Sequence, residues 1–489
     1  MTPRAVFAGL DPPLLWAHFS DITSIPRQSG HESAIAQYVA DWAVTSGFPF
    51  RRDAVGNICV YVPASGQSPG SRVVALQAHL DMVCVRAADS RSDPVKGLIE
   101  IVREGPWVVA PGSTLGADNG IGLAAAMSIA ESEDAQHGPL ELLFTVEEET
   151  TCRGADGLDP SLIHAKVMVN LDAETSGVLE IGCAGGTWTV LRWPVPTESL
   201  PQGWLTADIA ISGLRGGHSG LDIGKNRLNA LKAVVETIRR MAEHVTLRLC
   251  SIEGGDAINA IPIHAHATIA FPPAESPALA ECLEAARSTL ETRLAHADPG
   301  LSLSSTDVDP QGVKCWSEES GGRLLDLLAV VPSGVIAMEE LASELVETSN
   351  NLGIVALKKE GVEVHCLSRS SVATDLEETV ASIKSAARLA GADFAIVPPV
   401  LPPWRVAPDS AALATVQAVY RDLFHRDPKL VTVHAGAESG IVQQRIPGLE
   451  IVSLGPGIQG AHMPGERVNI PSVVEFYSLL SEVVQRLAR

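Results

Sequence analysis

Three apolar segments of the sequence each end in acidic or imidazole side chains, and this pattern constrains the fold more than any other feature. The segments SRVVALQAHLDMV, LELLFTVEEE and AKVMVNLDAE carry His79 and Asp81, Glu147–Glu149, and Asp172. Each has the pattern of a strand, and helical segments alternate with them. Such alternation predicts an α/β sheet covered by helices on both faces, with ligands bound at the carboxyl ends of the strands. We therefore expect these polar side chains to collect at one edge of the sheet.

Two helices are predicted near these strands. The segment SGHESAIAQYVADWAVTSGF has helical spacing of its apolar residues, with Ser29 as a candidate N-cap and Gly47 as a stop. The segment DNGIGLAAAMSIAES is rich in small residues. Small side chains suit a helix that packs closely on a sheet.

The three adjacent glutamates raise a question of charge. Carboxylates side by side at the mouth of a buried strand raise the free energy unless a positive group lies among them. A solvated acidic patch is the ordinary alternative. Because the apolar run LELLFTV leads directly into Glu147–Glu149, full exposure is the less favoured interpretation.

Further candidate residues each have an ordinary structural explanation when taken singly. His79 is a candidate metal ligand with Asp81 as the carboxylate that would accept its other N–H, although both residues also fit a plain loop. Asp118 lies between a glycine turn and a predicted helix, where Asp also serves as an N-cap. Asp172 fits a turn at a strand end, and His462 in GPGIQGAHMPGE fits a surface loop.

Taken together, these residues indicate a metal site. Two imidazoles with several carboxylates suit Zn²⁺ or another borderline divalent ion. The number of candidates exceeds what one tetrahedral ion needs. Two ions that share one carboxylate, about 3.5–4 Å apart as in dinuclear hydrolases, would use this surplus of ligands. The positive group among the glutamates would then be a dinuclear metal centre.

The whole chain narrows the class of protein. Its 489 residues carry a formal net charge of −22, which opposes binding to nucleic acid or to an anionic membrane surface. None of the eight cysteines forms a CxxC pair, which favours reduced thiols in a cytoplasmic protein. No apolar run approaches the roughly 18–20 residues that span a bilayer. The N-terminal segment is interrupted by prolines and is a poor secretory signal.

Residues 187–397 differ in character from the parts that flank them. Strands such as LTADIAISGLRGG and HAHATIAF accompany long helices such as NRLNALKAVVETIRRMAEH, and two further strands flank KKEGV. We therefore predict an α+β domain of residues 187–397 inserted into an α/β domain made of residues 1–186 and 398–489. The proline-rich segment VPPVLPPW is expected to mark the second boundary.

The order of motifs resembles a known family. HLDMVC, TLGADNGIG, LELLFTVEEE, NLDAE, GLRGGHSG, NAIP, VEVHCLSRS, HAGAESG and SLGPGIQGAHMPGE follow one another along nearly the whole chain. This order closely resembles the aminoacyl-histidine dipeptidases, also called Xaa-His or beta-Ala-His dipeptidases. They are cytosolic members of the di-zinc aminopeptidase/carboxypeptidase superfamily. The resemblance implies a catalytic domain with its sheet flanked by helices, and an inserted α+β lid domain.

The resemblance also implies roles for single residues. In the matching motifs, Asp81 orients a histidine ligand and Glu148 is the general base. Counting back from RGADGL leaves Glu147 as the extra acid. The implied metal ligands are His79 and Asp172 for one ion, Glu149 and His462 for the other, and Asp118 as the bridge.

Substrate contacts are implied mainly in the inserted domain. His218 of GGHSG, Asn259 of NAIP and Arg369 of LSRS match residues that contact the substrate or its tetrahedral intermediate. The guanidinium of Arg369 can bind both oxygens of a C-terminal carboxylate, although a surface arginine is the ordinary alternative. Glu438 of HAGAESG is a weaker candidate for holding the substrate amino end. This sequence departs from the family pattern at Thr150, Thr151, Met463 and Gly465.

The expected protein is a metal-dependent cytosolic dipeptidase. It would hydrolyse unblocked dipeptides such as beta-Ala-His by a metal-activated water, with two divalent ions per chain. Zinc is the expected metal, with cobalt or manganese as substitutes, and the resemblance implies a homodimer. Two rival functions are an N-acyl-amino-acid deacylase or broader peptidase on the same scaffold, and a non-catalytic metal-binding protein.

Overall fold

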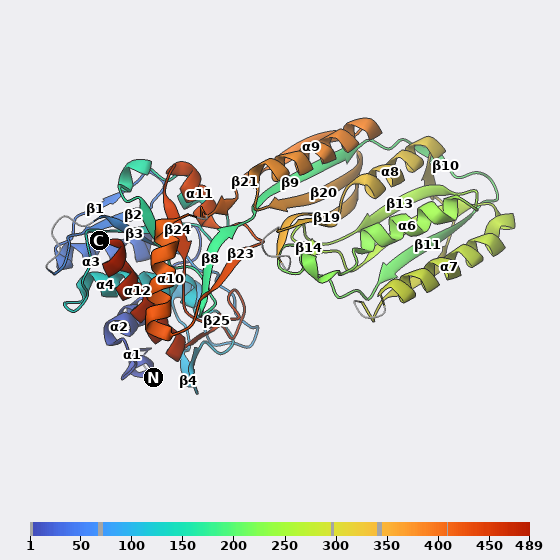
Figure 1. Ribbon diagram of the computed structural model, residues 1–489. Coiled ribbons are helices and arrows are strands. Elements are labelled where there is room, and N and C mark those ends of the chain that lie inside the picture. Colours follow the sequence, from blue (N-terminus) through green and yellow to red (C-terminus); the bar gives the residue numbers. More distant parts are fainter. Residues whose placement is uncertain (1–2, 67–71, 295–297, 340–344, 408) are drawn as a thin grey trace. The chain divides into compact units, whose positions relative to one another are not determined.

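The computed structural model describes residues 3–66, 72–294, 298–339, 345–407 and 409–489 (Figure 1). The chain forms two compact units. The first comprises Met1–Gly182, Trp404–Thr432 and Ala437–Arg489, and the second comprises Cys183–Pro403 and Val433–Gly436. The short segment Val433–Gly436 lies outside the predicted range of the inserted domain. It joins the second unit, where the backbone N–H of Ala184 donates to the carbonyl of Val433 at 2.9 Å.

A mixed nine-stranded sheet forms the centre of the first unit. Strands β6, β3, β7 and β24 are parallel to one another, and β1, β2 and β8 are antiparallel to their neighbours. All residues of β3 and β6 are buried, as expected for apolar strands covered on both faces. In sheet order the strands are β1 (Phe50–Arg52), β2 (Ile58–Val62), β6 (Leu140–Thr145), β3 (Val74–His79), β7 (Val167–Asn170), β24 (Glu450–Ser453), β8 (Val178–Cys183) and β22 (Trp404–Arg405), with β23 (Lys429–Val433) paired to β8.

Helices pack against this sheet, and α4 contacts both β3 and β6. Residues 117–129 of α4 are all buried, because its small side chains let the helix approach β3. The predicted helix after residue 29 is α3, and Gly47 ends it in the left-handed conformation. The Ser29 prediction is wrong: the residue before α3 is Glu32, and the Ser29 hydroxyl instead donates to Asp81 at 2.7 Å. The helices of this unit are α1 (Pro3–Phe7), α2 (Pro13–Ile22), α3 (Ser33–Ser46), α4 (Ala117–Glu131), α5 (Arg153–Asp156), α10 (Ala411–Phe424), α11 (Glu438–Arg445) and α12 (Ile470–Leu487).

A small four-stranded sheet joins two distant loops of the first unit. Its order is β25 (Ile458–Gln459), β26 (Arg467–Asn469), β5 (Trp107–Val109) and β4 (Val102–Glu104). Pairing of β26 with β5 brings the loop that carries His462 beside the loop that leads into α4. Two hydrogen bonds extend the contact: Ala110 N–H donates to the Glu466 carbonyl, and Gly465 N–H to the Ser113 carbonyl, both at 3.0 Å.

The second unit is an antiparallel sheet with four helices in a layer on it. Neighbouring helices in the layer are α9, α8, α6 and α7, in that order (Figure 1). In sheet order the main strands are β16 (Ser302–Val308), β11 (Leu205–Ser212), β15 (Ala265–Phe271), β13 (Arg248–Gly254), β19 (Val346–Lys358), β20 (Gly361–Ser370), β9 (Gly185–Trp193) and β21 (Asp393–Leu401), with β18 (Gly334–Met338) paired to β19. The helices are α6 (Ala230–Ala242), α7 (Ser276–Leu294), α8 (Glu318–Val330) and α9 (Ala373–Ala390), and the short strands are β10 (Thr197–Ser199), β12 (Gly217–His218), β14 (Ala260–Ile261) and β17 (Lys314–Trp316).

The proline-rich segment VPPVLPPW contains the boundary between the two units, which lies between Pro403 and Trp404, and its first five residues belong to the sheet of the second unit. Strand β21 runs through VPPVL and pairs with β9, with Val397 opposite Trp188 and Leu401 opposite Gly186. Proline lacks a backbone N–H and is tolerated at a sheet edge. Strand β21 lies at such an edge, which explains why prolines did not end the strand.

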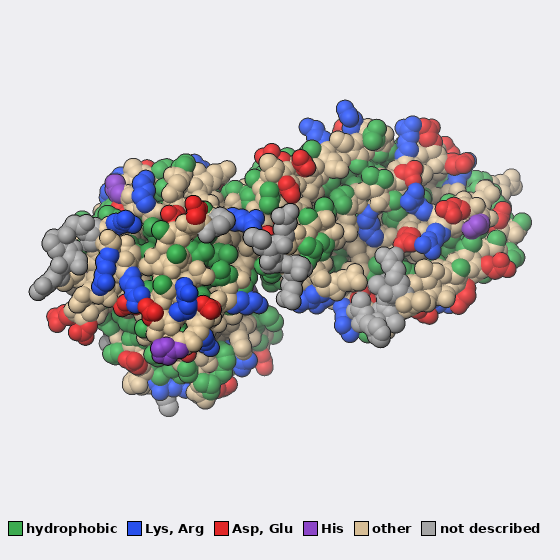
Figure 2. Space-filling view, viewed as in Figure 1, with side chains coloured by type: hydrophobic (Ala, Val, Ile, Leu, Met, Phe, Trp, Pro, Cys, Tyr) green, Lys and Arg blue, Asp and Glu red, His purple; other side chains and the backbone are tan. Residues whose placement is uncertain are grey.

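The surface carries both signs of charge. On the face in Figure 2, Lys and Arg side chains are interspersed with Asp and Glu on each unit. In the described part of the chain, no helix is both long and apolar enough to cross a membrane.

Candidate active site

His79 lies at the carboxyl end of β3 and is only 1% exposed. Its Nε2 is 2.9 Å from Asp118 Oδ1 and 3.2 Å from Asp172 Oδ1. Burial favours the neutral imidazole, but Asp172 and Asp118 outweigh it and raise the pKa of His79 well above its ordinary value. The end of β3, the start of α4 and the end of β7 therefore converge at one point, as the sequence predicted.

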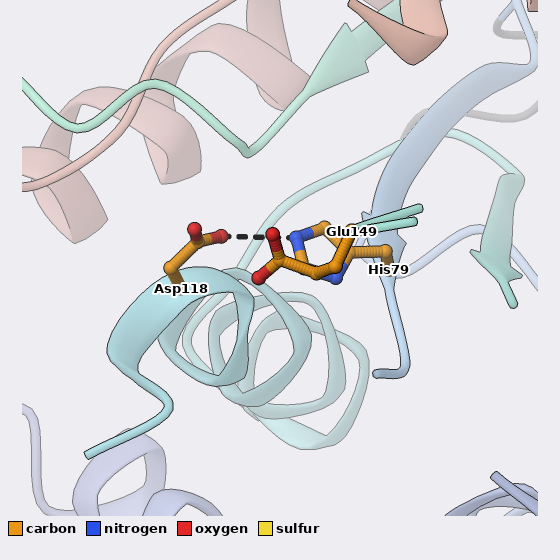
Figure 3. A group of neighbouring side chains, drawn as sticks. All are labelled: His79, Asp118 and Glu149. Carbon is orange, nitrogen blue, oxygen red and sulfur yellow. Dashed lines mark hydrogen bonds and ion pairs between the residues drawn. The ribbon is translucent and has the colours of Figure 1, made fainter. Parts of the chain in front are cut away.

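Asp118 lies between two histidines. Its Oδ1 faces His79, while its Oδ2 is 3.1 Å from Nε2 of His462. His462 Nε2 also lies 2.7 Å from Glu149 Oε2. Figure 3 shows His79, Asp118 and Glu149 together at the start of α4, and their nearest ligand atoms lie within 4.8 Å of one another.

These side chains fit a divalent metal site. Among the described residues, one oxygen of Glu149, Oε1, is buried without a hydrogen-bond partner, although a buried carboxylate oxygen normally has one. The carboxylates of Asp118 and Glu149 raise the pKa of the half-exposed His462 to about 11 through their hydrogen bonds, so positive charge is strongly favoured at this point. Imidazole nitrogens and carboxylate oxygens form a donor set suited to Zn²⁺.

Asp81 is fully buried and connects His79 to the glutamate turn. Its Oδ1 lies 3.4 Å from His79 Nδ1. The same carboxylate accepts hydrogen bonds from the backbone N–H groups of Glu148 at 3.1 Å and Glu149 at 3.2 Å. Asp81 can therefore orient the imidazole and the turn at once, and the sequence indicated only the first of these roles.

The three glutamates separate in space. Strand β6 ends at Thr145 and a turn follows, so the glutamates do not alternate across a sheet. Glu147 has φ +53° and binds Arg153, with 2.7 Å from Arg153 Nε to Glu147 Oε1. This hydrogen bond lowers the pKa of Glu147. Burial raises the pKa of Glu148 well above its ordinary range, while Glu149 lies beside His462.

Glu438 occupies the first position of α11 and is 2% exposed. Its Oε2 accepts hydrogen bonds from Gln77 Nε2 at 2.7 Å and from Thr145 Oγ1 at 2.8 Å. Burial raises its pKa to about 8. The structure thus places Glu438 against strands β3 and β6 of the first unit, next to the strand ends that carry the site.

The remaining predicted residues lie in the second unit. His218 is half-buried on β12, and its Nδ1 accepts hydrogen bonds from the backbone N–H groups of Gly220 and Leu221, each at 3.2 Å. Arg369 lies on β20 and is 7% exposed. Asn259 is exposed, and its carbonyl accepts the N–H of Ser219 at 2.8 Å, which fixes it beside the His218 loop.

Sequence analysis missed Glu466, which anchors the start of α4. Its buried carboxylate accepts backbone hydrogen bonds from Leu115 at 2.7 Å, Gly116 at 3.0 Å, Ala117 at 2.7 Å and Asp118 at 3.4 Å. A carboxylate at a helix N-terminus is favoured by the helix dipole and satisfies unpaired N–H groups. Glu466 thereby fixes the backbone that carries Asp118. In the sequence, the only signal for this role was the position of Glu466 four residues after His462.

Arg27 also binds the backbone before α4. It is fully buried and donates from Nη1 to the carbonyls of Leu80 at 3.1 Å and Asp81 at 2.6 Å. Its Nη2 donates to the carbonyl of Gly116. The loops after β3 and before α4 are therefore joined by one guanidinium.

Comparison with known proteins decides the family. The sequence pattern of peptidase family M20/M25/M40 matches residues 75–486. The chain belongs to this family. The cytosol non-specific dipeptidase of Escherichia coli (strain K12) is 37% identical over 480 residues, which cover 98% of each chain. The structure of aminoacylhistidine dipeptidase from Vibrio alginolyticus is similar with a TM-score of 0.92 and 34% identity over 98% of each chain.

A more distant structure shares the fold. Aminopeptidase PepT from Bacillus cereus ATCC 10987 matches with a TM-score of 0.57 and 16% identity over 98% of this chain and 100% of its own. The predicted family and fold class are confirmed. This M20/M25/M40 peptidase is a hydrolase that acts on peptide bonds.

Replacing Glu466 with glutamine is expected to destabilise this peptidase by about 1–3 kcal/mol, because buried backbone N–H groups lose a charged acceptor. The amide can accept with one oxygen only, and its N–H₂ group would face backbone N–H groups. Metal content should fall as well, since Asp118 loses its support. Thermal unfolding and metal analysis test this, with Glu133→Gln on the exposed surface as the control. Unchanged stability and metal content in Glu466→Gln would refute the anchoring role.

Proposed function

We propose that this peptidase is a metal-dependent cytosolic dipeptidase that hydrolyses unblocked dipeptides. The observation that carries the proposal is the convergence of two histidines and three carboxylates in the first unit. Asp118 lies within hydrogen-bond distance of both His79 and His462. Asp172 lies beside His79, and Glu149 lies beside His462. The names of the two similar proteins, a cytosol non-specific dipeptidase and an aminoacylhistidine dipeptidase, support the substrate class and the compartment.

Two divalent ions, with zinc as the proposed metal and cobalt or manganese as substitutes, would be held by five side chains. Asp118 would be shared, since its two oxygens face different histidines. When bound, the ions would lower the pKa of a water molecule and polarise the scissile carbonyl. His79 and Asp172 would hold one ion, and Glu149 and His462 the other.

The side chains of the protein would handle the proton and the substrate. Glu148 would accept a proton from the attacking water and donate it to the leaving amine, a role that typically contributes about 10²–10⁴-fold to the rate. The neighbouring backbone is fixed by Asp81, which supports a defined position for Glu148. His218 would donate from Nε2 to the developing oxyanion, because its Nδ1 already accepts two backbone hydrogen bonds. Arg369 would hold the substrate carboxylate.

The proposed substrates are Xaa-His dipeptides such as beta-Ala-His, together with other unblocked dipeptides. Assay of a panel of dipeptides that vary in the C-terminal residue, each with a free and an N-acetylated amino end, tests this. Cleavage of the free dipeptides and its loss on acetylation is the expected result. Retained or faster cleavage of the acetylated compounds would instead identify an N-acyl-amino-acid deacylase.

The proposal includes a homodimer, which the family resemblance implies. Apolar side chains exposed on the second unit support it: Val330 at the end of α8 is 69% exposed, Leu389 on α9 is 82% exposed and Ile336 on β18 is 47% exposed. Light scattering on the active enzyme measures the state directly, and a fully active monomer would contradict the proposal.

A further inference from the structure

Within the part of the chain that the structure describes, a buried arginine of the second unit has a donor nitrogen without a partner. Arg369 is 7% exposed, and its Nε has no hydrogen-bond partner among the described residues. In the described ranges, its guanidinium makes no ion pair with a carboxylate within 4.0 Å. Burial alone lowers the pKa of Arg369 to about 10, a change too small to remove its charge at neutral pH. An unpaired buried cation is costly, so an anionic ligand is expected beside it.

His434 lies in the segment that joins the second unit, and it also has an unused nitrogen. It is 8% exposed, and its Nε2 lies 2.7 Å from Ser349 Oγ. Its Nδ1 is buried without a hydrogen-bond partner among the described residues. A histidine with a purely structural role in a core would normally use both nitrogens, since a buried unsatisfied polar atom costs about 1–3 kcal/mol.

Sheet register places His434 and Arg369 in one neighbourhood. Ser349, which holds the His434 imidazole, is directly opposite Arg369 in the pairing of β19 with β20. On the other side of β20, Arg369 is opposite Gly186 of β9. A Cβ at Gly186 would lie 3.9 Å from Arg369 Nη1, so the guanidinium extends beside a position that has no side chain.

His218 completes the cluster. The carbonyl of His434 and the ring of His218 both approach Gly220, where an added Cβ would lie 3.1 Å from His218 Cε1. Burial, followed by the charges of Arg369 and His218, lowers the pKa of His434 to about 4. His434 is therefore a neutral imidazole at physiological pH, and it can offer a Nδ1–H donor when Ser349 donates to its Nε2.

We infer that His434 is a further specificity-determining residue, which binds the C-terminal carboxylate of the substrate together with Arg369. The inference rests on the proposed function, in which Arg369 holds that carboxylate. A planar guanidinium binds carboxylate oxygens in a forked geometry, and a third donor from another direction favours this anion over a neutral amide. Ser349 fixes the imidazole and so acts as a positioning residue for His434.

The test compares two substrates that differ only at the C-terminus, a dipeptide acid and the corresponding dipeptide amide. His434→Phe keeps a ring of similar size but removes both nitrogens. We expect the variant to raise KM for the acid about tenfold or more, equivalent to about 1.4 kcal/mol, with a much smaller change in kcat. The KM of the amide, or its Ki where it is not cleaved, should change less than threefold.

Two further variants distinguish binding from a structural role. His434→Gln retains an amide donor and should recover part of the preference for the acid. His244→Phe, at an exposed histidine of the same unit, should leave both substrates unchanged. Equal losses for acid and amide, or no loss for either, would overturn the role of His434. Failure of the proposed function is distinguishable, because wild-type enzyme would then cleave no free dipeptide at all.

Discussion

Replacing Glu148 with glutamine is expected to lower kcat by about 10²–10⁴-fold, the range that general base catalysis contributes. Metal content should stay at the wild-type value, because the contacts that gather His79, Asp118, Glu149 and His462 do not involve the side chain of Glu148. The backbone N–H of residue 148 would still donate to Asp81, so the turn should remain intact. Steady-state kinetics on a dipeptide and metal analysis of the same preparation give both quantities.

Glu147→Gln is the matched control for this variant. The Glu147 carboxylate binds Arg153, whose guanidinium is about half exposed, at 2.6–2.7 Å. Loss of such a partly exposed pair costs little, typically about 0–1 kcal/mol. Its kcat should therefore stay near that of the wild type. If Glu147→Gln were instead the inactive enzyme with full metal content, the assignment of base and ligand would be wrong by one residue.

The second large effect is expected from Glu149→Ala, which should weaken binding of one of the two metal ions. Loss of a partner outside the ligand set already lowers metal affinity about 10–100-fold, so loss of a ligand should cost at least that much. Activity should fall with the metal. Isothermal titration of metal-free protein measures the affinity for each ion, and Glu147→Ala is the control.

This result separates the roles of the neighbouring glutamates. Glu149→Ala should recover activity when the metal concentration is raised, whereas Glu148→Gln should not. A Glu149→Ala enzyme that binds both ions with wild-type affinity would remove Glu149 from the ligand set.

The strands and helices around the site were predictable because their signals are local. The apolar runs that end at His79 and Thr145 fill β3 and β6, which are buried along their whole length. Alternation of these strands with helices indicated parallel strands, whose carboxyl ends meet at one edge. The convergence of His79 and Asp172 followed from this geometric rule, whereas Asp118 reaches them from the start of a helix.

Contacts between distant segments were not predictable in the same way. Glu466 binds backbone N–H groups about 350 residues earlier in the chain, and nothing in the local sequence marks a carboxylate that will cap a distant helix. His434 contacts Ser349 because the short segment Val433–Gly436, which contains His434, belongs to the second unit. Ser29 failed as a predicted helix cap because its hydroxyl forms a tertiary hydrogen bond to Asp81 instead. The extension of β21 through the first two prolines was not predictable, because the effect of a proline depends on the place of its strand in the sheet.

We propose that peptide hydrolysis by this enzyme depends on two divalent ions, held by His79, Asp118, Asp172, Glu149 and His462. The most direct measurement is a titration of exhaustively chelated enzyme with Zn²⁺, in which dipeptide hydrolysis and bound metal are followed together. Hydrolysis should be abolished by chelation and should return as the bound metal approaches two ions per chain. Undiminished turnover of protein that metal analysis finds to be metal-free would contradict the claim.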